Sequence, residues 1–410
     1  MTSLDASATV GSSRERRSAE AVDLSWASAL VVDDVEENRD LLVRRLKRLG
    51  IADIVQAENG RVALERLGER AFDLVLLDIM MPEMNGYEVL DVLSAEGRTH
   101  DLPVLVISAL NEIEAVAKCI EQGAEDFIFK PFNPTILRAR VLASLEKKHL
   151  RDAARRELER KRAELNEARN LQLALAPPSV ERIAPLGRIA IEAKLEPARE
   201  VGGDLVDHFE IGERLHVLLV GDVSDKGAGA ALVMARTHGQ FRALAARPDA
   251  EAVFADPARA AGEVNRALAL GNSSCMFVTL FLGVLDVTTG ELAYVRCGHV
   301  PPWIRRADGS VERLMVAAGL PLGVMENVSY RTGQSRLAAG DVLLSVTDGV
   351  TEGAARDGSL FGDDRAEAWL SKAAADDGLD ALIAEVRAFE AGQPPADDVA
   401  AVLLRIGGAA

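Results

Sequence analysis

The chain has 410 residues, a length typical of two or three domains, with 48% hydrophobic and 27% charged residues. This composition excludes a chain that is disordered throughout. The formal net charge is −17, which argues against a general nucleic-acid or anionic-membrane binder, because both need a basic face. Such acidity serves solubility, or it reflects carboxylates gathered around metal ions, and the positions of the acids must separate the two explanations.

Three cysteines, Cys119, Cys275 and Cys297, lie far apart and form no CxxC pair. This usage is typical of a reducing compartment and excludes a disulfide framework or a cysteine zinc site. All three stand among apolar residues, so we expect buried structural thiols. No apolar run is long enough to cross a bilayer, and the N-terminus lacks the apolar core of a secretory signal. We predict a cytoplasmic protein whose residues 1–26 form a disordered tail.

Residues 27–146 alternate short apolar runs with amphipathic stretches, a pattern typical of a parallel sheet covered by helices on both faces. The expected strands are 29–32, 53–57, 73–77, 103–107 and 126–129, and the expected helices are 36–49, 60–68, 86–95 and 112–122. We therefore predict an α/β doubly wound domain with a five-stranded parallel sheet. Ligands of such sheets bind beyond the carboxyl ends of the strands.

A long helix is predicted next, because about forty residues from Thr135 to Leu175 contain neither Gly nor Pro. Leu158 and Leu165 keep a heptad spacing, which favours a coiled-coil linker over residues 147–178 that pairs two copies of the chain. A solvated helix face is the alternative. The prolines at 177 and 178 end the helix.

Residues 179–408 have a different character, with Thr-Gly and Asp-Gly turns that indicate antiparallel hairpins. The expected strands are 188–195, 215–220, 276–286, 291–297, 341–346 and 398–404. The expected helices are 228–246, 257–269 and a pair near 364–391. This pattern predicts an α+β domain.

Five polar residues follow strands of the first domain: Asp33 and Asp34 after the first strand, Asp78 after the third, Ser108 after the fourth and Lys130 after the fifth. Parallel strands end at one edge of their sheet, so these residues converge there. Three carboxylates suit Mg²⁺. A lysine and a hydroxyl would hold the oxygens of a phosphoryl group on Asp78, and an aspartyl phosphate is a recognised covalent intermediate. The alternative, that these acids only cap the following helices, does not explain five matched strand ends.

The segments VVDDVEEN, LVLLDIMMPEMNGYEVL, VLVISAL and DFIFKPF resemble the response regulator receiver domain over about 120 residues. This resemblance implies that a sensor histidine kinase or a phosphotransfer protein phosphorylates Asp78. It assigns Mg²⁺ binding to Asp33 (through water), Asp34, Asp78 and the Met80 carbonyl, phosphoryl contacts to Ser108 and Lys130, and the aromatic switch position to Phe127.

Acidic residues flank apolar runs again in the C-terminal region. They are Asp204 in REVGGDLVD, Asp222 in LLVGDVSDKG, Asp348 in LLSVTDGVTEG, and Asp397 and Asp398 in PPADDVAAVLL. Ionised carboxylates beside buried strands are costly unless they are paired or bind a cation. No histidine stands nearby in the sequence, so the ligand set is all oxygen, which favours Mg²⁺ or Mn²⁺ over zinc. Two such cations about 3.5–4 Å apart can generate a hydroxide and clamp a phosphate.

Other phosphate-handling or hydrolytic sites have weaker support. The chain has no GxxxxGK[ST] loop and no GxSxG elbow, which argues against a P-loop NTPase and an α/β-hydrolase. The stretch GAGAAL at 227–232 lacks the third small residue of a dinucleotide fingerprint. The GGD at 202–204 continues as Leu-Val, where cyclic-dinucleotide cyclases have Glu-Phe.

The segments PAREVGGD, VGDVSDKGAGAAL, GLPLGV, VTDGVTEG and ADDVAAVLL resemble, in this order, the SpoIIE/RsbU-type branch of the metal-dependent protein phosphatase 2C superfamily. The resemblance covers about residues 165–405 and implies an antiparallel β-sandwich flanked by helices, with two Mn²⁺ or Mg²⁺ ions. The implied ligands are Asp222 bridging both ions, the Val223 carbonyl, Asp204 at one ion, and Asp348 with Asp397 at the other, with Asp398 as the substitute for Asp397.

Four further positions keep two readings each. Arg199 has the spacing of a phosphate-binding arginine, or it forms a surface ion pair. Asp207 and Asp225 support the ligands or bind a third metal, or they do neither. His299 is a candidate acid, but its CGHVPP motif favours a structural role. The family often has a hydroxyl residue after the Asp397-Asp398 pair, where this chain has Val399, Ala400 and Ala401, which would weaken support of the metal ligands.

Together the resemblances imply a two-component response regulator whose output is metal-dependent dephosphorylation of a phosphoserine or phosphothreonine protein, an anti-sigma-factor antagonist by family analogy. The segment LNEARNLQLALAPPSV resembles the helix that precedes such phosphatase domains and predicts a homodimer through this helix, in which phosphorylation of Asp78 alters the metal site. The alternative is a receiver-gated, non-catalytic scaffold that sequesters a partner-switching protein. We predict neither a nucleic-acid nor a membrane partner.

Overall fold

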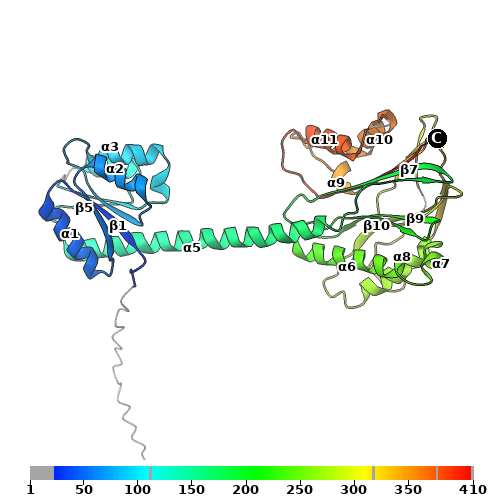
Figure 1. The fold of residues 1–410 in the computed structure, drawn as a ribbon, viewed down its shortest axis with the longest axis horizontal. Helices are drawn as coiled ribbons and strands as arrows, with labels where there is room; N and C mark the ends of the chain where they lie inside the picture. Colours follow the sequence, from blue (N-terminus) through cyan, green and yellow to red (C-terminus); the bar gives the residue numbers. More distant parts are fainter. Residues whose placement is uncertain (1–22, 110–112, 316–318, 375–376, 408–410) are drawn as a thin grey trace, which may run out of the picture. The chain divides into compact units, whose positions relative to one another are not determined.

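The computed structural model describes residues 23–109, 113–315, 319–374 and 377–407, and these divide into two compact units, Met1–Glu159 and Arg160–Ala410 (Figure 1). Most of the predicted N-terminal tail lies outside the described residues. Its last part is an exception, because Leu24 is buried in the core of the first unit. The prediction of a tail that reaches residue 26 was therefore wrong at its end, where Leu24 and the nearby Ala27 both lie in this core.

The first unit is a five-stranded parallel sheet with the strand order β2-β1-β3-β4-β5. Its strands are β1 Ser28–Val32, β2 Asp53–Ala57, β3 Leu74–Asp78, β4 Val104–Ser108 and β5 Asp126–Phe129. Its helices are α1 Glu36–Arg48, α2 Gly60–Glu69, α3 Gly86–Ala95, the short η1 Arg98–His100, and α4 Ile113–Glu121. Strands β1, β3 and β4 send alternate side chains into two core clusters, one on each face of the sheet. The predicted doubly wound fold is confirmed.

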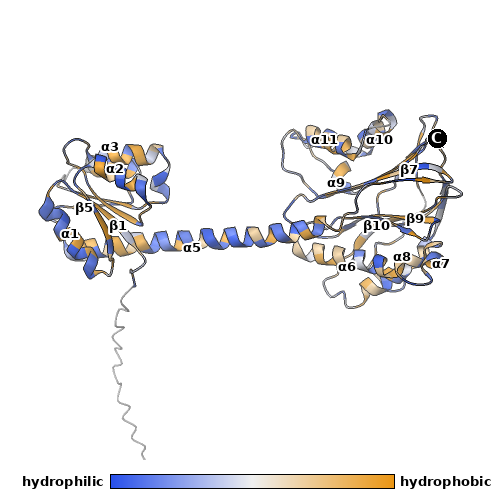
Figure 2. Cartoon of the chain, viewed as in Figure 1, coloured by the Kyte–Doolittle hydropathy of each residue, from blue (hydrophilic) through white to orange (hydrophobic). Residues whose placement is uncertain are grey.

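Helix α5, Pro134–Leu173, is the long helix that the sequence predicts. Its first turns bury Leu137, Val141 and Leu145 in the core of the first unit. Its middle is mostly hydrophilic (Figure 2), although Leu150 and Leu158 are exposed there. Its last turn belongs to the second unit, where Gln172 is buried. The helix is thus a structural part of both units.

The second unit contains two antiparallel sheets that pack face to face. One has the order β14-β11-β10-β9-β8 and the other β13-β12-β15-β16-β7-β6. The strands are β6 Val180–Ala184, β7 Gly187–Glu196, β8 Leu205–Ile211, β9 Leu215–Val223, β10 Val278–Asp286, β11 Glu291–Cys297, β12 Trp303–Arg305, β13 Val311–Arg313, β14 Gly333–Arg336, β15 Val342–Val346 and β16 Val399–Gly407. Side chains from both sheets, such as Phe281 and Leu404, form the shared core.

Helices cover the outer face of each sheet (Figures 1 and 2). The first sheet is covered by α6 Ala228–Ala245, α7 Ala250–Phe254 and α8 Pro257–Ala269. The second is covered by α9 Asp348–Thr351, α10 Gly362–Lys372 and α11 Leu379–Glu390. The unit is therefore a four-layered α-β-β-α sandwich, which confirms the predicted antiparallel sandwich flanked by helices.

Strand β8 is missing from the expected strands, because its sequence LVDHFEI places polar residues where an apolar strand was sought. Asp207 and His208 are nevertheless buried, whereas Glu210 is exposed. Asp207 pairs with Arg242 of α6, and His208 contacts His216 of β9. The pattern failed here because partners distant in the sequence satisfy the buried polar groups.

The expectation of three buried thiols is wrong for Cys275. Cys119 and Cys297 are buried, whereas Cys275 is exposed in the loop before β10. Its adjacent apolar neighbours, Met276 and Phe277, precede β10 and are themselves not buried, so an apolar neighbourhood in the sequence did not indicate burial here.

Candidate functional sites

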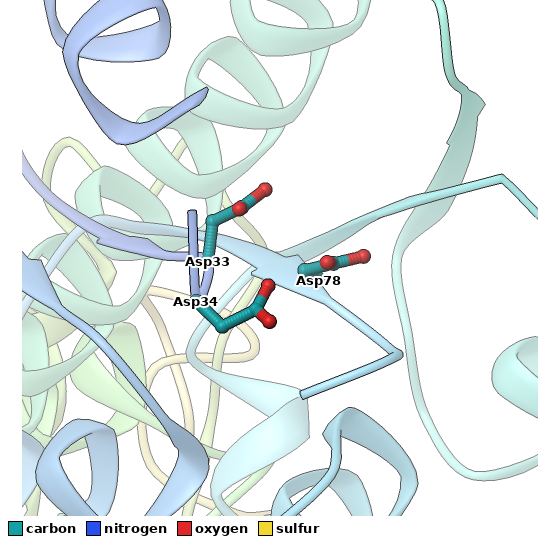
Figure 3. Close-up of side chains that lie close together, drawn as sticks. All are labelled: Asp33, Asp34 and Asp78. Atoms are coloured by element: carbon teal, nitrogen blue, oxygen red, sulfur yellow. The ribbon is translucent and has the colours of Figure 1, made fainter. Parts of the chain in front are cut away.

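Three carboxylates gather at the carboxyl edge of the parallel sheet (Figure 3). Asp33 and Asp34 follow β1, and Asp78 is the last residue of β3. One oxygen from each carboxylate lies within 4.8 Å of the others, with Asp33 and Asp78 buried and Asp34 exposed. This oxygen set fits a hard divalent cation that keeps some of its waters. The structure thus brings together the three acids that the strand-end argument selected.

Lys130, which follows β5, lies between two of these acids. Its Nζ is 2.7 Å from Asp33 Oδ2 and 2.9 Å from Asp78 Oδ2. Burial raises the pKa of Asp78, and the Lys130 ammonium opposes that shift. Asp33 also accepts hydrogen bonds from the Val35 N–H and the Asn38 amide. The first site is therefore a compact acid group with its own buried counter-charge.

The remaining predicted residues of this site lie at the same edge. Ser108 is the buried last residue of β4, and its carbonyl accepts the Lys130 N–H at 2.8 Å. Phe127 on β5 is buried, with its ring 4.9 Å from that of Phe129. Met80, two residues after Asp78, is an exposed side chain.

The second unit brings acids together from both of its sheets. Asp204 directly precedes β8 and is almost fully buried, and Asp222 lies within β9. Asp348 begins α9 directly after β15, and Asp397 and Asp398 directly precede β16. Elements far apart in the sequence thus deliver the predicted ligands to one region of the sandwich.

Repulsion between these carboxylates shows that they are electrostatically close. Burial raises the pKa of Asp204 well above its usual value, and the charges of Asp222, Asp398 and Asp348 raise it further. Burial, with repulsion from Asp348, raises the pKa of Asp222 to about 7. Burial and the neighbouring Asp397 raise the pKa of Asp348 as well. Acids that resist ionisation together fit a site completed by divalent cations, because a cation removes the repulsion.

The acids of the second unit are not gathered as tightly as the three acids of the first unit. Among the described residues, the triad of the parallel sheet is the only one whose acidic ligand atoms all lie within 4.8 Å of one another.

Thr347 is a supporting residue that sequence reasoning missed. Its hydroxyl donates a 2.7 Å hydrogen bond to Asp204 Oδ2 and accepts the Ala400 N–H at 2.9 Å. The hydroxyl that was sought after Asp398 is thus supplied from the position before Asp348. The threonine in the VTDG segment was visible, but only the pairing of β15 with β16 shows that it reaches Asp204.

Asp397 and Asp398 have different surroundings. The buried Asp398 carboxylate accepts the N–H groups of Ala198 and Gly203, each at 2.7 Å. A Cβ atom at Gly202 would lie 2.2 Å from Asp398 Oδ2, so only glycine fits there. Asp397 is partly exposed, and its Oδ2 lies 2.8 Å from Lys226 Nζ.

The end of helix α5 holds the loop that leads to Asp204. The Gln172 amide donates to the Gly202 carbonyl at 2.9 Å and accepts the Gly202 N–H at 3.0 Å. Arg169, one turn earlier, donates to the Arg199 carbonyl at 3.2 Å. The Arg199 side chain itself is exposed. Gln172 was not among the predicted site residues, because a glutamine near a helix end carries no distinctive sequence signal.

Asp207, Asp225 and His299, for which the sequence left two roles open, have different surroundings. Asp207 is fully buried and forms a two-pronged ion pair with Arg242, with His238 Nε2 at 3.0 Å. Asp225 is exposed. His299 is buried with Nδ1 3.2 Å from Thr279 Oγ1, and burial lowers its pKa to about 3, so the ring is neutral. The contacts of Asp207 and His299 favour structural roles.

Comparisons with known proteins find a matching family model within each unit. Residues 29–142 match the response regulator receiver domain, and residues 212–407 match the family described as Stage II sporulation protein E (SpoIIE). Within the described residues, no helix combines the length and apolar character needed to cross a membrane.

Individual relatives match parts of the chain. Protein IcfG of Synechocystis sp. is 32% identical over 229 residues, which are 50% of this chain and 35% of that protein. A probable cyclic di-GMP phosphodiesterase of Vibrio cholerae is 38% identical over 130 residues, 32% of this chain and 29% of that protein. The chain spans about a third of the length of these relatives. The SiaA-PP2C domain of Pseudomonas aeruginosa has the same fold, with a TM-score of 0.52 at 21% identity, covering 62% of this chain and 99% of that domain.

Proposed function

Because this chain combines a response regulator receiver domain with a SpoIIE-type, protein phosphatase 2C-like domain, we propose that it is a response regulator whose output is metal-dependent protein dephosphorylation. The observation that carries this proposal is the acid group of the second unit, where burial and mutual repulsion raise the pKa of Asp204, Asp222 and Asp348. Such repulsion between buried carboxylates does not stabilise the fold, whereas the same carboxylates are suited to binding divalent cations.

In the proposed phosphatase site, Asp222, the Val223 carbonyl, Asp204, Asp348 and Asp397 would hold two Mn²⁺ or Mg²⁺ ions, with Asp222 contributing to both, Asp204 to one, and Asp348 with Asp397 to the other. When bound, such ions supply a hydroxide nucleophile and neutralise the phosphate. The chain's own residues orient the ligands: Thr347 fixes one oxygen of Asp204. Because both oxygens of Asp398 accept loop N–H groups, we assign Asp398 to holding the loop and keep Asp397 as the ligand. The exposed Arg199 is the proposed contact for the substrate phosphate.

In the proposed receiver site, Asp78 accepts a phosphoryl group from a sensor histidine kinase or a phosphotransfer protein. Asp33, Asp34, Asp78 and the Met80 carbonyl hold Mg²⁺, and Ser108 with Lys130 contacts the phosphoryl oxygens. The lysine is already placed for this role, because its ammonium lies 2.9 Å from Asp78 Oδ2.

The proposed substrate is a phosphoserine or phosphothreonine protein, and by family resemblance an anti-sigma-factor antagonist that is released for partner switching. Phosphatase assays with the full chain test the activity. We expect Mn²⁺-dependent hydrolysis of p-nitrophenyl phosphate and of a phosphorylated antagonist, and a loss of about a thousandfold in Asp222→Asn. Folded, Mn²⁺-binding protein that hydrolyses neither substrate would favour the non-catalytic scaffold.

We further propose that the receiver gates the phosphatase through a dimer of helix α5. The support is that α5 contributes Leu137, Val141 and Leu145 to one core and, through Gln172, holds the loop beside Asp204 in the other unit. A rigid helix that is part of both units can transmit a two-state change. Turnover by wild type and Asp78→Asn, each with and without acetyl phosphate, tests the gating. Equal rates in a phosphorylated, dimeric wild-type sample would contradict it.

A further inference from the structure

A single lysine side chain lies against the proposed ligands of the second metal ion. Lys226 Nζ is 2.8 Å from Asp397 Oδ2 and 2.9 Å from the Ala396 carbonyl. An ammonium group therefore supplies positive charge where the proposed function calls for a divalent cation.

The turn that carries Lys226 has a backbone conformation that is fixed by hydrogen bonds. Its neighbours Asp225 and Gly227 have φ angles of 80° and 84°, and Asp225 Oδ1 accepts the Lys226 N–H at 2.9 Å. Left-handed backbone at a residue other than glycine is costly and persists only when the surroundings enforce it. Just before the turn, Ser224 exchanges hydrogen bonds with the backbone of Phe277 at 2.8 and 2.9 Å. The side chain of Lys226 thus extends from a backbone segment whose position is fixed.

The lysine can leave without disturbing the core. Its side chain is 42% exposed and that of Asp397 is 26% exposed, so the ammonium can move into solvent by rotation of its own stem. A divalent cation bound to Asp397 would repel the ammonium and compete for the same carboxylate oxygen. The Lys226 ammonium and a divalent cation would therefore each weaken the binding of the other to Asp397.

We propose that Lys226 is a built-in counter-ion of the phosphatase site: it holds Asp397 in the metal-free protein and is displaced when a divalent cation binds. The inference rests on the proposed function and goes beyond it, because it gives the chain its own competitor for the metal. Lys226 lowers the affinity for the second ion and limits repulsion among the acids when that ion is absent.

Mn²⁺ binding to the full-length protein, followed by EPR of the free ion, tests the proposal independently of catalysis. All proteins carry Asp34→Asn, which removes a carboxylate from the receiver site. Lys226→Gln removes the charge at similar length and Lys226→Arg keeps it. Lys194→Gln is the matched control, because Lys194 forms a partly exposed ion pair with Asp380 on another part of the unit.

We expect Lys226→Gln to bind Mn²⁺ about three- to tenfold more tightly, which corresponds to the loss of one partly exposed ion pair together with its repulsion of the metal. The same variant should unfold at a lower temperature in EDTA, and Mn²⁺ should stabilise it more than it stabilises wild type. Lys226→Arg and Lys194→Gln should bind Mn²⁺ as wild type does.

Unchanged or weaker Mn²⁺ binding by Lys226→Gln would overturn the inference and leave the proposed function intact. If none of these proteins bound Mn²⁺ in the phosphatase unit, the proposed function would fall and the inference with it.

Discussion

The two acid groups of this chain solve the same electrostatic problem in different ways. In the receiver, Lys130 is 20% exposed and lies within 3 Å of Asp33 and Asp78, so a fixed cation offsets the buried charge. In the phosphatase unit, Asp204 and Asp222 have no comparable buried lysine among the described residues, and the more exposed Lys226 pairs with the partly exposed Asp397. The receiver group is balanced before any metal binds, whereas the phosphatase group is not.

This difference matches the chemistry proposed for each group. A receiver aspartate must accept a phosphoryl group and lose it again, so a permanent cation beside it serves both states. A hydrolytic site must hold two metal ions against solvent, and a group of acids that repel one another gains the most from binding them. Both groups consist of aspartates, but the position of the neighbouring lysine separates the two roles.

The largest expected effect comes from making the same substitution in each group. Asp204→Asn should lower Mn²⁺-dependent hydrolysis about a thousandfold, while in EDTA it should stabilise the phosphatase unit by on the order of 1 kcal/mol, because a repelled charge is removed. Asp33→Asn should destabilise the receiver by about 2 kcal/mol, because Lys130 loses a charged partner. Calorimetry of the full chain in EDTA measures both shifts, and shifts of the same sign would remove the distinction between the groups.

A second expected effect concerns the support of Asp204. Thr347→Val removes the hydroxyl that bonds Asp204 Oδ2 and should lower hydrolysis and Mn²⁺ affinity about 10- to 100-fold. The matched control is Ser345→Ala in β15, two residues before Thr347, because the Ser345 hydroxyl is buried without a hydrogen-bond partner among the described residues. Equal losses in both variants would show that the effect comes from packing of β15 rather than from the hydroxyl.

The third expected effect is a pH dependence of the metal-free phosphatase unit. The Asp222 carboxyl has a pKa of about 7 in the folded unit and titrates near 4 when unfolded. Between these values only the folded form keeps the proton, so the stability in EDTA should fall as pH rises from 4 to 7 and then level off. Mn²⁺ affinity should change in the opposite direction, weakening by up to about tenfold per pH unit below 7.

Denaturant titrations and Mn²⁺ binding across this pH range measure the two trends. Asp222→Asn should flatten the stability profile. If the stability of the wild-type protein in EDTA rose with pH, the acids of the phosphatase unit would not repel one another as proposed.

The smallest expected effect is at Gln172. Gln172→Ala removes two hydrogen bonds to Gly202 and should reduce the response of hydrolysis to Asp78 phosphorylation about two- to tenfold, with a smaller change in basal rate. Asn170→Ala, an exposed position of the same helix, is the control. An unchanged response in a dimeric, phosphorylated Gln172→Ala sample would remove Gln172 from the coupling.

The sequence predicted best where neighbours along the chain decide the structure. All five receiver strands and the convergence of Asp33, Asp34, Asp78 and Lys130 follow from apolar runs and the common edge of parallel strands. It failed where distant residues decide. The burial of Asp207 depends on Arg242, and the support of Asp204 depends on Thr347, which lies between β15 and α9. Sequence patterns do not reveal such pairs, because the two residues of each pair come together only in the folded unit.

The exposed Cys275 makes the phosphatase unit easy to observe. Of the three thiols it is the only exposed one, because Cys119 and Cys297 are buried. It stands two residues before Phe277, whose backbone is hydrogen-bonded to Ser224 beside Asp222. A maleimide fluorophore should therefore attach to one known position without any engineered cysteine. Its emission would report changes at the turn that carries Ser224, next to Asp222, in real time.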